Sequence, residues 1–111
     1  MPTYKPKKTI TIEQHEGTVG DFVFVMDEQL SLDGKSVRMV VKNSRGRTIM
    51  SKTSLGDAPT IIINSQTVVT PFTVDDTLHK YGRHNVEYDI VNEAGDSILA
   101  IPGIFIINKQ I

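Results

Sequence analysis

The stretch that decides the fold runs from Thr73 to Ile106 and opens with Thr73-Val-Asp-Asp-Thr-Leu-His-Lys-Tyr-Gly82. Thr73 suits a helix N-cap, Asp76 stands in a capping-box-like position, and Gly82 suits the residue that follows a helix end. The turn or two between them is therefore predicted to be helical. Helical turn, strand, Gly-bearing turn and strand, in that order, are typical of the closing end of a small β-sandwich.

Two strand patterns follow this helical turn, whose buried stripe is expected to hold Val74 and Leu78. Residues 84–91 alternate apolar and polar side chains, and the turn signal Asn92-Glu-Ala-Gly95 comes next. The last strand pattern, residues 97–107, is expected to break or bulge at Pro102-Gly103. The residues of the first pattern predicted to point inward are Val86, Tyr88 and Ile90.

The earlier part of the chain adds short alternating segments separated by turn signals. Leu32-Asp-Gly34 precedes a hairpin that Asn43-Ser-Arg-Gly46 closes, with Val37, Met39 and Val41 predicted to point inward. Residues 60–70 predict either two short strands or one strand broken at Ser65-Gln66, and the pattern leaves both open. The remaining predicted strands are residues 9–13, 21–27, 36–42 and 47–53.

About seven or eight strands and one short helical turn favour an all-β fold, an antiparallel Ig-like two-sheet sandwich. The 111 residues fit one domain. Residues 1–8, with two prolines and three lysines, are expected to form a flexible basic N-terminal arm, and residues 9–111 a single β-sandwich domain.

The composition favours protein partners over polyanions. Twelve Lys and Arg against 13 Asp and Glu give a net charge of -1, so nucleic acid is not an expected partner. The absence of cysteine excludes disulfides and thiolate metal sites. No apolar run is long enough for a membrane span, and the N-terminus lacks the apolar segment of a secretory signal, so synthesis in a cytoplasm is expected.

No catalytic, cofactor or metal site is predicted. The three histidines, His15, His79 and His84, do not have the spacing of a metal-ligand motif. Asp75 and Asp76 stand where carboxylates cap a helix, which explains them better than acid–base chemistry does. No Gly-x-Ser-x-Gly elbow and no glycine-rich phosphate loop is present.

Apolar side chains at outward positions are the main candidates for a contact surface. Val23, Val25 and Val40 point away from the predicted core, as do alternate residues of 61–63 and 104–107, and the chain ends in Ile111. The strand at residues 21–27 is therefore expected to be covered on both sides. Another subunit, pairing of strand edges between chains, or the loop at residues 51–59 folded over a thick core would each provide that cover.

The basic arm is a second candidate contact. Tyr4, Lys5, Lys7 and Lys8 combine an aromatic ring with cations, which suits an acidic protein patch or a nucleic-acid phosphate. A solvated tail has the same composition. No second basic cluster accompanies the arm, so the lysines are expected to be secondary contacts.

With these elements in order, the chain resembles the Ig-like sandwich domains of tailed-phage virion proteins, in particular the N-terminal domain of upper baseplate proteins and related tail or neck modules. The resemblance spans roughly residues 17–107. It rests on Gly20-Asp21, Leu32-Asp-Gly-Lys-Ser-Val-Arg-Met, Asp76-Thr77, Gly82 leading to Val86-Glu-Tyr-Asp-Ile, and Gly95. These positions are structural in that family, so the resemblance implies an assembly role in the virion, in several copies, and no active site.

The leading hypothesis is thus a non-enzymatic structural protein of a phage virion, bound to other virion proteins or to copies of itself. The chain departs from the upper baseplate pattern because no linker and C-terminal domain follow the sandwich, so a decoration, neck or tail accessory role is equally open. A carbohydrate- or ligand-binding sandwich module is the alternative, with Tyr81 as its candidate stacking ring. No cofactor, small-molecule substrate or membrane is expected.

Overall fold

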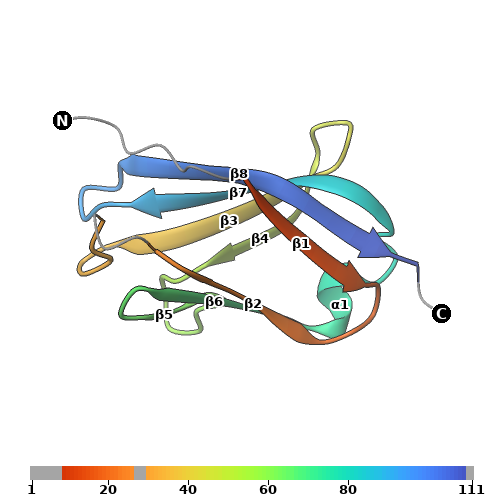
Figure 1. The fold of residues 1–111 in the computed structure, drawn as a ribbon, viewed down its shortest axis with the longest axis horizontal. Helices are drawn as coiled ribbons and strands as arrows, with labels where there is room; N and C mark the ends of the chain where they lie inside the picture. The colour runs from red at the N-terminus through yellow and green to blue at the C-terminus, as the bar shows by residue number, and fades with distance from the viewer. Residues whose placement is uncertain (1–8, 27–29, 110–111) are drawn as a thin grey trace.

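A computed structural model describes residues 9–26 and 30–109 of the chain. Its described residues form eight strands and a one-turn helix, arranged as two sheets packed face to face (Figure 1). The elements are β1 (Ile10–His15), β2 (Gly20–Val25), β3 (Ser36–Lys42), β4 (Thr48–Thr53), β5 (Ile62–Asn64), β6 (Thr67–Phe72), α1 (Val74–Thr77), β7 (Gly82–Val91) and β8 (Ser97–Asn108). The strand order is β1-β8-β7-β3-β4 in one sheet and β2-β6-β5 in the other.

This strand order confirms the predicted Ig-like sandwich. In the larger sheet, β8, β7 and β3 are followed by a further strand, β4, which pairs with β3. The larger sheet of variable-type Ig domains is extended at the same place. One pair departs from the antiparallel prediction. β1 runs parallel to β8, from Ile10 opposite Gly103 to His15 opposite Asn108. Parallel neighbours require a long connection, and here the whole domain lies between the two strands.

Aromatic contacts between the two sheets form the centre of the core. The rings of Phe24 on β2 and Tyr88 on β7 meet edge to face, with centroids 5.1 Å apart. Phe72 on β6 meets Phe105 on β8 in the same way at 5.2 Å. Beside them, the hydroxyls of Thr70 and Tyr88 lie 2.7 Å apart in a buried hydrogen bond. These contacts join the sheets of a chain that has no cysteine for a disulfide.

Most of the inward and turn positions predicted from the sequence are confirmed. Gly34 and Gly46 have φ of 69° and 78°, the left-handed region that their tight turns require. Residues 62–72 form two strands, because Ser65 adopts φ of 58° and closes a hairpin between β5 and β6. The predicted inward residues of β3 and β7, all buried, are Val37, Met39, Val41, Val86, Tyr88 and Ile90.

The helical turn differs from its prediction at two positions, Gly82 and Val74. Asp76 does cap it, accepting the backbone N–H of Thr73 at 2.7 Å. However, α1 ends at Thr77, and the left-handed residue after it is His79, φ 62°, so the prediction for Gly82 was wrong. Val74 is 44% exposed, and Thr77 takes the buried position instead. The hydroxyl of Thr77 accepts the Gly17 N–H at 2.9 Å, which turns this side of the helix inward.

The last strand is not interrupted, so the predicted break or bulge at Pro102-Gly103 was wrong. β8 pairs with β7 in unbroken register through this point, with Glu87 opposite Pro102 and Val86 opposite Gly103. β1 joins the other side of β8 only from Gly103 onward. Pro102 therefore lies where β8 has a single neighbour strand, a position at which a missing N–H is tolerated.

Candidate functional site

The outer face of the three-stranded sheet carries a row of apolar side chains. Val23 on β2 is opposite Val69 on β6, and Val69 is opposite Ile62 on β5. Phe22 and Phe24 point into the core, so their neighbours on β2 point outward. The row Val23–Val69–Ile62, called here the apolar row, thus crosses the whole width of this sheet.

The described part of the chain leaves the apolar row open to solvent. Val23 and Ile62 are each 52% exposed, and Val25 next to them is 70% exposed. Cover of β2 by the described residues of the same chain is therefore wrong, and cover by another subunit stays a prediction. Leu55, in the loop that was a candidate cover, is itself exposed. Adjoining exposed apolar side chains make this face the candidate surface for contact with another molecule.

The outer face of the five-stranded sheet is different, because it holds an open groove of about 690 Å³ lined mainly by polar side chains. Val40 lies in this groove, half-buried among charges. Arg38 and Lys42 flank it on β3, and Glu87 and Asp89 lie on the neighbouring β7. The Arg38 guanidinium pairs with the Asp89 carboxylate at 3.5 Å. The groove balances two cations against two anions and has no net charge to attract a polyanion.

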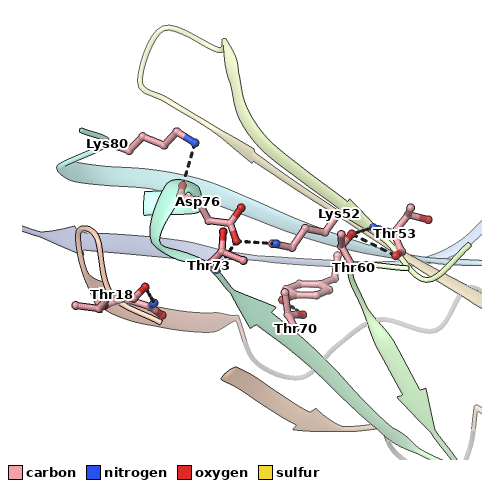
Figure 2. Close-up of polar contacts among 10 residues, drawn as sticks. Thr18, Lys52, Thr53, Thr60, Thr70, Thr73, Asp76 and Lys80 are labelled. Atoms are coloured by element: carbon pink, nitrogen blue, oxygen red, sulfur yellow. Dashed lines mark hydrogen bonds and ion pairs between the residues drawn. The ribbon is translucent and has the colours of Figure 1, made fainter. Parts of the chain in front are cut away.

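A part-buried ion pair lies beside the helical turn. Figure 2 shows the Lys52 amine reaching Asp76, and Nζ lies 2.8 Å from Oδ2. Burial raises the pKa of Asp76, but hydrogen bonds from Lys52 and Thr73 outweigh it and hold that pKa below its ordinary value of 3.8. Lys80 donates to the Asp76 carbonyl at 2.9 Å. These bonds join β4 to α1, so we interpret the cluster as structural.

The candidate contact residues do not form one surface. Val23 and Val25 lie on the outer face of the three-stranded sheet, whereas Val40 lies on the opposite face of the sandwich. Tyr4, Lys5, Lys7, Lys8 and Ile111 lie outside the described residues. Val69 was missed by sequence reasoning, because only the register between β2, β6 and β5 places it in the row.

The histidines lie apart in the fold, with His15 on β1, His79 after α1 and His84 on β7. Nε2 of His84 is 2.7 Å from the Lys80 carbonyl. In residues 9–26 and 30–109, no three metal-ligating side chains lie close enough to hold an ion. In the same residues, no helix has the length and apolar character needed to cross a membrane.

No protein-family model matches the chain, and no curated protein matches it. Among solved structures, the chain is similar to the extracellular domain of the voltage-gated sodium channel beta4 subunit, with 11% identity, full coverage of both chains and a TM-score of 0.43. That domain forms parallel homodimers, which explain its role in cell–cell adhesion. A likeness this distant says nothing about the partner or role of the present chain.

Proposed function

We propose that this chain is a non-enzymatic structural protein of a phage virion, an accessory module of the tail, baseplate, neck or head that acts through protein–protein contacts. The observation that carries the proposal is the apolar row, which lies open to solvent on a regular sheet face. A rigid, two-sheet sandwich with such a face is suited to docking against another folded surface.

The polar groups of the sandwich support a structural role over catalysis. The pKa values of Asp76 and Tyr88 depart from the ordinary, and each side chain is bonded to a neighbouring element of the fold. Neither faces the groove on the five-stranded sheet. A catalytic site needs an acid, a base or a nucleophile that converges on a space for substrate.

The resemblance to phage sandwich domains supports the proposal that the particle is a phage virion. The motifs that carry it occupy structural positions here, with Asp76 in α1, Gly82 at the start of β7 and Gly95 in the β7–β8 turn. A module of this kind works in several copies, so that weak individual contacts add up across a symmetric particle.

Mass spectrometry of purified virions of the encoding phage tests the proposal. We expect peptides of this chain in multiple copies per particle, and absence of the chain from purified virions would overturn the proposal. An Ile62→Lys variant should lower incorporation, because it places a charge in the apolar row. A Leu55→Lys variant is the matched control, because Leu55 is also apolar and exposed but lies in the loop before β5.

A further inference from the structure

Three of the four edge strands in the described residues carry features that discourage pairing with another chain. β5 has only three residues. β4 has a buried, inward-pointing lysine, Lys52, and its pairing with β3 shifts register beside Lys42. β1 carries the polar side chains of Glu13 and His15 on its exposed face. Short length, inward charge, bulges and edge charges are the usual means by which proteins protect sheet edges.

The fourth edge, β2, has the charge of Asp21 near its start and lacks the other features. It has six residues without proline, lysine or an irregularity in its register with β6. Its outward side chains are Asp21, Val23 and Val25, two of them apolar and more than half exposed. A regular, apolar edge that the described residues leave unpaired is a template for strand addition.

The backbone of β2 is also set for strand pairing. The N–H of Met26 donates to the carbonyl of Gln66 at 2.7 Å, on the β6 side. Because backbone groups alternate in direction along a strand, every second residue back from Met26 also faces β6. The N–H and C=O groups of Asp21, Val23 and Val25 therefore point toward the open edge, spaced as an antiparallel partner requires.

We propose that β2 pairs with β2 of a second copy, antiparallel and about a twofold axis at Val23, so that two three-stranded sheets join into one of six strands. This inference rests on the proposed assembly role and names its partner. A twofold contact between identical strands is self-complementary, and it needs no surface beyond the one described. The two apolar rows then form a single row across the joined sheet.

The charge on β2 selects this arrangement over the parallel one. In the twofold antiparallel register, Asp21 lies opposite Val25 of the second copy, and the two aspartates are at opposite ends of the contact. Parallel pairing in register would set Asp21 beside Asp21 of the second copy, and like charges directly opposite each other are destabilising.

The contact is expected to be weak in isolation. One pair of strands buries less than the roughly 800 Å² per partner of a standard interface. The measurement is therefore sedimentation equilibrium of the full chain over a wide concentration range, with a reversible monomer–dimer equilibrium as the expected result. A strict monomer at every concentration would overturn the inference.

Two lysine substitutions on the same strand test the register. Val23→Lys sets two lysines against each other at the axis and should weaken the dimer by about fivefold or more. Val25→Lys instead sets each new lysine opposite Asp21 of the second copy and should strengthen the dimer by about twofold to tenfold. Both positions are solvent-exposed, so the fold is retained, as thermal denaturation can check. Weakening by both variants would overturn the inference.

Ile62 provides the matched control, because it lies in the same row as Val23, has the same 52% exposure, and belongs to the opposite edge of the sheet. The chain has no cysteine, so a single introduced one reports on its own contacts. In a hydrogen-bonded antiparallel pair the Cα atoms are about 5.5 Å apart, within disulfide range. Val23→Cys should cross-link on mild oxidation and Ile62→Cys should not. Equal cross-linking would place the contact on the sheet face and overturn the inference.

This result is separate from the virion test. A chain that is present in purified virions but whose Val23 and Ile62 variants behave alike would refute the β2 contact and leave the assembly role intact. A chain that forms the β2 dimer but is absent from virions would refute the assembly role alone.

Discussion

Lys52 and Asp76 form a bridge between a sheet edge and the one-turn helix, with Nζ of Lys52 2.8 Å from Oδ2 of Asp76. The Lys52 side chain is 6% exposed and its amine lies 5.5 Å from the centre of the Phe72 ring. The same carboxylate oxygen accepts the N–H of Thr73. The Asp76 carboxylate thus pairs with a buried cation and also caps the helix, and these bonds hold α1 against β4.

Removing Asp76 should therefore lower the free energy of unfolding more than removing Lys52 does. Asp76→Ala leaves the buried lysine without its partner and should lower the free energy of unfolding by about 3 kcal/mol or more. Lys52→Met keeps most of the side-chain volume and leaves Asp76 bonded to Thr73, so its cost should be no more than about half as large. Urea denaturation of the two variants measures this difference. Equal costs would show that the capping bond contributes little.

Acid should weaken the fold through the same carboxylate. The pKa of Asp76 is below its ordinary 3.8 in the folded chain, so the unfolded chain takes up the proton first as the pH falls. This contribution to stability is complete well above pH 3.8 and is lost as the pH falls through the folded-state pKa. Urea denaturation between neutral and strongly acidic pH should show a shallower decline for Asp76→Asn than for the original chain.

The sequence predicted the sheets better than it predicted their surfaces. Period-2 alternation located Val86, Tyr88 and Ile90 in the core because one face of β7 is buried and the other is polar. The predicted buried stripe of α1 failed at Val74, because a single turn is too short to define a helical stripe. Thr77 lies inward instead, where its hydroxyl accepts the Gly17 N–H.

The candidate site could be predicted only in part. Val23 was predicted as an outward apolar residue from local alternation alone, and Ile62 belongs to residues 61–63, whose alternate faces were expected to be apolar. That they share one row with Val69 depends on the pairing of β2 with β6 and of β6 with β5. Register between distant strands is set by tertiary packing, so it could not be read from local pattern.

The Thr70–Tyr88 hydrogen bond should behave as a coupled unit. Tyr88→Phe leaves the Thr70 hydroxyl without its partner in the core, and Thr70→Val does the same to Tyr88, so each should cost about 1–3 kcal/mol. The double variant removes both polar groups and should cost less than the sum of the two. A double-mutant cycle by urea denaturation measures the coupling, and strictly additive costs would contradict the bond's role.

Alkaline pH should also weaken the fold. Burial raises the pKa of Tyr88 to about 12, and the hydrogen bond with Thr70 offsets only part of that rise. Because the unfolded phenol ionises near its ordinary value of 10, this stabilising contribution is present below pH 10 and is lost as the pH rises toward about 12. Between pH 10 and about 12, the free energy of unfolding should fall less steeply for Tyr88→Phe than for the original chain. Absorbance titration of the folded chain should show one phenol that ionises only near pH 12.

The close approach of β1 to β8 should depend on Gly103. A Cβ at this position would overlap the carbonyl oxygen and the side chain of Ile10, which pairs with Gly103 at the start of β1. Because part of this clash is with backbone, a rotamer change cannot relieve it, and Gly103→Ala should cost about 1–3 kcal/mol. Hydrogen exchange should also become faster along β1. Gly20→Ala is the control, because Gly20 begins β2 and a Cβ there meets only the Gln14 side chain, 3.5 Å away. That variant should be close to neutral, and a comparable loss in both would show that glycine at Gly103 is not needed for the approach.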